Sequence, residues 1–90
     1  MLSSNRTGKF KHEFALAEKR GKDMAKLIDV MTMIINEQPL PPERKNHLLH
    51  GEYQGRWECH IEPNWLLIYA IDKVAKEVTF YHTGSHSDLF

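Results

Sequence analysis

The hydrophobic residues of this 90-residue chain change their spacing once, on either side of a proline-rich segment. Before that segment, apolar residues recur every three or four positions, which is the period of an amphipathic helix. After it they alternate with polar residues or run continuously, as they do in strands. Pro39, Pro41 and Pro42 separate the two halves and stop a helix from continuing. The pattern predicts an α+β domain in which the helices precede the strands.

Two helices are predicted before the prolines, in residues 1–36. The first has one apolar face, made of Phe10, Phe14 and Ala17. Gly21 ends it, and Asp23 is a candidate N-cap for the second helix. The expected buried stripe of the second helix is Met24, Leu27, Ile28, Met31, Ile34 and Ile35. We expect the two helices to form an N-terminal helical hairpin packed on the sheet. Residues 2–5 are a weaker candidate for a short strand, because they show no alternation.

Three antiparallel strands are predicted after the prolines. In the first, one face carries Trp57, Cys59 and Ile61, and the other carries Arg56, Glu58 and His60. Glu62, Pro63 and Asn64 form a turn sequence. The continuous apolar run at 65–71 predicts a central strand buried on both faces. In the last strand Val78, Phe80 and His82 alternate with Glu77, Thr79 and Tyr81. The whole chain, 1–90, is expected to be one domain.

The charges balance overall but not along the chain. Residues 1–50 hold nine Lys and Arg against six Asp and Glu, a net charge of +3, and residues 51–90 hold three against six, a net of −3. The zero total excludes a strongly basic nucleic-acid coat protein. The single cysteine excludes an internal disulfide and indicates a reducing cytoplasm. The pattern predicts neither a membrane span nor a signal peptide, and therefore no membrane partner.

Two kinds of reaction chemistry are disfavoured by the arrangement of residues. Cys59 and His60 are neighbours on a strand and point to opposite faces, so they cannot form a nucleophile–base pair with each other. Cys59 is expected to be a buried core thiol. The spacings of His47 with His50 and of His82 with His86 resemble metal-ligand spacings, but no confident helix carries either pair. We therefore expect no metal and no other cofactor.

Acid–base chemistry by several imidazoles is a third possibility. Histidine titrates nearest neutrality, so a group of histidines can supply both a base and an acid. Metal-free RNA cleavage needs a base for the 2′-hydroxyl proton, donors for the phosphorane and an acid for the departing 5′-oxygen. Spacing alone leaves open that the histidines are scattered over the surface without a shared function.

Three blocks in the second half resemble one protein family. The first is Lys45, Asn46 and His47 with Gly51, the second is 56–69 (RWECHIEPNWLLIY), and the third is 83–90 (TGSHSDLF). Together they are similar to the YafQ branch of the RelE superfamily, which are toxins of bacterial type II toxin–antitoxin systems. The resemblance implies a RelE-like fold of the microbial RNase type. It also implies ribosome-dependent, metal-independent cleavage of messenger RNA, which inhibits translation.

The resemblance implies site residues and partners as well. His47, His60 and His86 correspond to the acid–base and phosphate-stabilising group, with His86 as the proton donor to the leaving oxygen. Phe90 corresponds to a terminal aromatic residue that orients the message. The remaining implied catalytic positions are Glu58, Asn64 and His82. The implied partners are the 70S ribosome, mRNA and a cognate antitoxin of the DinJ or RelB type in a hetero-oligomer, with operator DNA bound only through the antitoxin.

Two positions depart from the family pattern. The family usually has Asp where this chain has Asn64, and Arg where it has His82. Asparagine cannot ionise, and histidine replaces a permanent bidentate cation with a pH-dependent one. An alternative function is therefore a catalytically weakened homologue that acts mainly as an antitoxin-binding and co-repressor module.

Basic residues concentrate in the first 26 positions. A solvated helix face is the simplest interpretation of such a cluster, and docking on ribosomal RNA phosphates is the functional one. The residues assigned to RNA or ribosome binding are Lys9, Lys11, Lys19, Arg20, Lys22 and Arg56.

Overall fold

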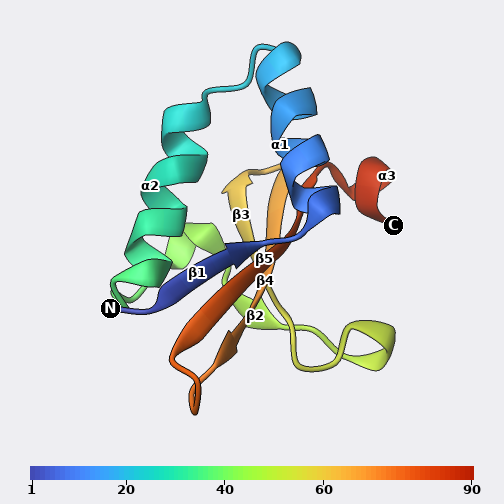
Figure 1. Ribbon diagram of the computed structural model, residues 1–90. Helices are drawn as coiled ribbons and strands as arrows, with labels where there is room; N and C mark the ends of the chain where they lie inside the picture. Colours follow the sequence, from blue (N-terminus) through green and yellow to red (C-terminus); the bar gives the residue numbers. More distant parts are fainter.

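The computed structural model describes residues 1–90 as a five-stranded sheet with two helices on one face (Figure 1). The elements are β1 (Ser3–Arg6), α1 (Gly8–Lys19), α2 (Met24–Ile35), the 3-10 turn η1 (Pro42–Arg44), β2 (His47–Leu48), the 3-10 turn η2 (Gly51–Tyr53), β3 (Trp57–Glu62), β4 (Trp65–Asp72), β5 (Glu77–Gly84) and α3 (His86–Leu89). The strand order is β1-β5-β4-β3-β2. All neighbours are antiparallel except β1, which is parallel to β5. The predicted α+β class with an antiparallel arrangement of the later strands is confirmed.

Local caps set the ends of the two long helices. The Thr7 hydroxyl accepts the Phe10 N–H at the start of α1, and the Asp23 carboxylate accepts the Ala25 N–H at the start of α2. Gly21 has a φ of 77°, the left-handed conformation that glycine adopts most easily, and lies between the helices. The predicted end of α1 and the predicted N-cap of α2 are therefore confirmed. The helices follow each other as expected, with α1 packed mainly on β5 and α2 on β3.

The buried face of α2 differs from the predicted stripe at two positions. Ile28 is 46% exposed, whereas Val30 is buried. Leu27, Val30 and Ile34 are spaced by three and four residues, and together with Met31 they centre the apolar face away from Ile28. The expectation for Ile28 was wrong because the buried face is turned toward Val30, which the predicted stripe did not include.

The parallel strand β1 is the element that sequence pattern supported least. All four of its side chains are exposed, so no apolar alternation marks it. Its place in the sheet comes from the backbone pairing with β5, and the Leu2 N–H donates to the Ile35 carbonyl 2.8 Å away. Backbone hydrogen bonds therefore define this edge strand, and side-chain burial does not.

The core lies between the sheet and the two long helices. Leu67 at the centre of β4 is fully buried, and the neighbouring Leu66 and Ile68 are buried as well, although they do not belong to the core cluster under the helices. The predicted two-sided burial of this strand is confirmed for its first five residues. Trp65 is also buried, and its indole N–H donates to the Thr83 hydroxyl, 2.9 Å away. Trp65 is therefore a packing residue of the core.

A β-bulge changes the face of His82. Tyr69 pairs with Phe80, but the preceding Ile68 pairs with His82, so Tyr81 is the extra residue. Directly paired residues share a face, which places His82 on the side of Ile68 and not on the side of Phe80. The prediction that His82 shares a face with Phe80 was wrong, because Tyr81 has no partner in β4 and the alternation of faces shifts by one residue there.

Candidate active site

A buried carboxylate lies between two imidazoles on the sheet face away from the long helices. Glu58 of β3 is only 5% exposed. Its Oε1 atom lies 3.4 Å from Nε2 of His47 and 3.8 Å from Nε2 of His60. The sheet explains the grouping, because His47 pairs directly with Glu58 across β2 and β3, and His60 follows Glu58 by two residues on the same face.

The orientation of His47 is fixed from both sides of its ring. Its Nδ1 lies 2.7 Å from the Lys45 carbonyl oxygen. A carbonyl oxygen only accepts, so Nδ1 donates to it and Nε2 faces the Glu58 carboxylate. Both ring nitrogens of His47 therefore have an oxygen partner.

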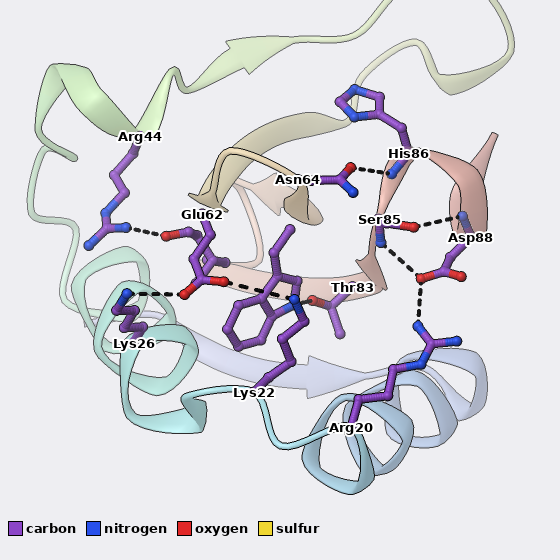
Figure 2. A network of polar contacts seen from close by, with 12 residues as sticks. Arg20, Lys22, Lys26, Arg44, Glu62, Asn64, Thr83, Ser85, His86 and Asp88 are labelled. Atoms are coloured by element: carbon purple, nitrogen blue, oxygen red, sulfur yellow. Dashed lines mark hydrogen bonds and ion pairs between the residues drawn. The ribbon is translucent and has the colours of Figure 1, made fainter.

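His86 reaches the same region from α3. Its ring centroid lies 6.1 Å from that of His60 and 6.1 Å from that of Phe90. The His86 backbone N–H donates to Oδ1 of Asn64 in the β3–β4 turn at 3.4 Å (Figure 2). We call His47, Glu58, His60 and His86 the histidine cluster. The histidines that the sequence singled out for catalysis are therefore brought together from β2, β3 and α3.

A capping box holds the turn of α3 that carries His86. The Ser85 hydroxyl accepts the Asp88 N–H at 3.1 Å, and the Asp88 carboxylate accepts the Ser85 N–H at 3.0 Å. Arg20 at the end of α1 pairs with the same carboxylate at 2.9 Å. The hydrogen bond from the Ser85 backbone, followed by that from Arg20, lowers the pKa of Asp88 below its usual value. Asp88 thus joins α3 to α1.

Aromatic rings and a guanidinium flank the histidine cluster. The rings of Tyr53 and Phe90 meet edge to face at 5.5 Å. Arg56 lies over the Tyr81 ring at 4.0 Å and near the Tyr53 ring at 5.9 Å. Neither Tyr53 nor Tyr81 was among the predicted site residues. Tyr53 is an isolated aromatic residue in a polar loop, a feature by which the sequence could have indicated it.

His82 has a different partner from the other site histidines. Its Nδ1 lies 3.0 Å from Oε1 of Glu13 on α1, and both side chains are 20% exposed. His82 therefore pairs with Glu13, whereas His47 and His60 share Glu58.

Apart from Arg56, the basic residues assigned to RNA binding divide into two groups. Lys9, Lys11 and Lys19 are exposed on α1 and form no ion pair within residues 1–90. Arg20 instead pairs with Asp88. Lys22 lies 3.9 Å from Glu62, which also binds Lys26, and its ammonium group is 5.7 Å from the centre of the Trp65 ring. Figure 2 shows these cations directed at partners within the chain.

Cys59 is fully buried in the core cluster. Burial raises the pKa of its thiol to about 12. Its predicted role as a core thiol is confirmed.

No group of three or more His, Cys, Asp and Glu side chains in residues 1–90 has an arrangement that could hold a metal ion.

The burial of Cys59 predicts that its thiol resists alkylation. We expect no modification of the folded protein by iodoacetamide at pH 8, because only about 10⁻⁴ of a thiol with this pKa is ionised and its sulfur is inaccessible. Mass spectrometry of the treated protein checks this, with the denatured protein as the positive control. Rapid modification under native conditions would contradict the assignment.

The mixed sheet has two long helices on one face, and on the other face two histidines flank one carboxylate while a third lies beside His60. This combination defines a RelE-like toxin domain. A family model described as "Bacterial toxin of type II toxin-antitoxin system, YafQ" matches residues 2–90. The chain belongs to this YafQ toxin family.

Three matches, two of them to YafQ of E. coli, show how similar the chain is to known toxins. The mRNA interferase toxin YafQ of Escherichia coli K12 is 43% identical over 86 residues, which cover 93% of this chain and 90% of that protein. A crystal structure of the E. coli DinJ–YafQ complex matches with a TM-score of 0.92 and 40% identity, covering 100% of this chain and 99% of that chain. A crystal structure of a metal-bound toxin from Helicobacter pylori matches with a TM-score of 0.94 and 37% identity over the whole of both chains.

None of the helices of this chain has the length and apolar character needed to cross a membrane.

Proposed function

We propose that this toxin is a ribosome-dependent mRNA endoribonuclease that acts in the cytoplasm and inhibits translation. The observation that carries the proposal is the histidine cluster, in which Glu58 joins two imidazoles and His86 stands beside them. The E. coli relative, which is named an mRNA interferase, supports the reaction class.

The cluster supplies both proton transfers that RNA cleavage needs. An imidazole of the pair held by Glu58 takes the proton from the 2′-hydroxyl, whose oxygen then attacks the neighbouring phosphorus. The bond from phosphorus to the 5′-oxygen breaks, and His86 donates a proton to that departing oxygen. The other protonated imidazole stabilises the charge of the phosphorane. The products are a 2′,3′-cyclic phosphate and a free 5′-hydroxyl.

The residues around the cluster position the message. Phe90 presents its ring beside His86 and Tyr53 contacts Phe90, and stacking of such a ring on an RNA base is worth about 1–3 kcal/mol. Arg56 provides a permanent cation next to these rings. The exposed Lys9, Lys11 and Lys19 of α1 are available to bind ribosomal RNA phosphates, a contact that salt weakens.

The proposed protein partner is a cognate antitoxin of the DinJ or RelB type. The E. coli relative in complex with DinJ supports this assignment. In such a hetero-oligomer the antitoxin suppresses cleavage, and operator DNA is bound through the antitoxin alone.

Expression with and without the cognate antitoxin tests the function. We expect growth to stop when the toxin is expressed alone, and primer extension to show new 5′ ends within translated messages. The same messages rendered untranslatable by removal of the start codon serve as the control for ribosome dependence. Intact messages and normal growth at high expression would contradict the proposal.

The weakened-homologue alternative has a test at the two departing positions. Asn64 offers only a neutral oxygen to the His86 N–H, and His82 is paired with Glu13. If the alternative holds, the double variant Asn64→Asp, His82→Arg raises the cleavage rate about tenfold or more, because a carboxylate strengthens the hydrogen bond and arginine restores a permanent cation. Primer extension measures the rate, and Asn5→Asp on exposed β1 is the matched control. An active parent whose rate the double variant does not change would exclude the alternative.

A further inference from the structure

The four residues of α3 carry His86, yet so short a helix has little stability of its own. No residue of α3 is buried. A cavity of about 370 Å³, lined by residues of α1, the β3–β4 turn and α3, lies on the α1 side of this helix. Because apolar side chains do not fill that space, polar contacts hold α3 on the side of α1.

One carboxylate oxygen makes two of those polar contacts. Oδ2 of Asp88 accepts the Ser85 N–H at 3.0 Å and the Arg20 guanidinium at 2.9 Å. The first contact closes the cap of α3, and the second ties that cap to the end of α1 (Figure 2). The glycine at the end of β5 makes room for this arrangement. A Cβ atom at Gly84 would lie 3.1 Å from Cβ and 3.2 Å from Oδ2 of Asp88.

We propose that Arg20 is a positioning residue, which through Asp88 holds α3 so that the His86 ring faces His60. This inference rests on the ribonuclease function proposed above. It assigns Arg20 a role within the domain, whereas the sequence grouped it with the RNA-binding cations. Exposed ion pairs are individually weak. This pair nevertheless matters, because its acceptor oxygen also caps the turn from which His86 projects.

A set of variants separates positioning from RNA docking. Arg20→Ala removes the link, Arg20→Lys keeps the charge, and Asp88→Asn keeps an oxygen for the Ser85 N–H while it removes the charge that attracts Arg20. Asp29→Ala is the matched control, since Asp29 is exposed on α2 and forms no ion pair. Lys19→Ala is the comparator for loss of an exposed cation from the same helix.

Two measurements are made on each variant. The first is the rate constant of mRNA cleavage on programmed ribosomes at saturating toxin, together with the toxin concentration that gives half that rate. We expect Arg20→Ala and Asp88→Asn each to lower the saturating rate about threefold to tenfold at an unchanged half-saturating concentration. The double variant should be no slower than either single variant, and Arg20→Lys should recover most of the rate.

The second measurement does not depend on activity. Nuclear Overhauser contacts between the His60 and His86 rings should weaken in Arg20→Ala, and the amides of Leu89 and Phe90 should exchange faster, while the circular dichroism of the fold is unchanged. Unchanged ring contacts would overturn the inference. A higher half-saturating concentration at an unchanged saturating rate, as docking predicts and as Lys19→Ala should show, would overturn it too. If the parent cleaves no message but Arg20→Ala loses the ring contacts, the ribonuclease proposal fails and the positioning of His86 stands.

Discussion

Replacing His86 with alanine is expected to lower the rate of mRNA cleavage about 10²–10⁴-fold, the usual contribution of a positioned general acid. The His86 ring lies beside His60 and Phe90. In the proposed reaction it is the only member of the histidine cluster that protonates the departing 5′-oxygen. Its backbone N–H, which alanine retains, contacts Asn64. The cap of α3 is made by Ser85 and Asp88, so the substitution should not disturb it.

The rate is measured by primer extension on ribosome-bound messages, and antitoxin binding is measured on the same preparation. His50→Ala is the matched control, because His50 is exposed and its side chain forms no hydrogen bond at the start of η2. We expect the control to cleave at the parental rate and both variants to bind antitoxin. Parental cleavage by His86→Ala, or its failure to bind antitoxin, would contradict the assignment.

Replacing Leu67 with aspartate is expected to unfold the domain. Leu67 is fully buried at the centre of β4, between β3 and β5, and belongs to the core under α1 and α2. The change leaves a carboxyl group without a partner in an apolar site and removes the burial of a leucine, a combined cost of at least about 4 kcal/mol. Domains of this size have a total stability of only about 5–15 kcal/mol.

Thermal and denaturant unfolding followed by circular dichroism measures the effect. Val74→Asp is the matched control, because Val74 is 97% exposed in the β4–β5 turn and aspartate remains in water there. We expect the control to unfold at the parental midpoint. A soluble Leu67→Asp protein with a native-like cooperative transition would show that the core assignment is wrong.

The fold was predictable wherever burial leaves a period in the sequence. The stripe of α2 and the continuous run of β4 are such cases, since each faces apolar neighbours. β1 left no such signal, because its four exposed side chains say nothing about the backbone pairing with β5. The bulge at Tyr81 was equally invisible, since no special residue type marks it, and it decides the face on which His82 lies.

The candidate site was predictable as a set of residues and not as an arrangement. The resemblance named His47, His60 and His86, but they are separated by up to 39 positions and their proximity depends on how β2, β3 and α3 meet. The carboxylate between the imidazoles follows from the pairing of His47 with Glu58. For Arg20 the residue type was misleading. Its charge suggested RNA binding, whereas its guanidinium pairs with the Asp88 carboxylate of α3.

The sequence by itself determined the class of the fold, most of the core residues and the family to which the chain belongs. Those properties depend on local periodicity and on residue types at fixed spacing, and both are visible in the linear sequence. The tertiary structure decided which polar groups meet, namely Glu58 with two histidines, Glu13 with His82, and Arg20 with Asp88. Such pairs join residues that are distant in the chain. Their polar atoms interact only within about 3–4 Å of each other, so the fold of the backbone decides which pairs form.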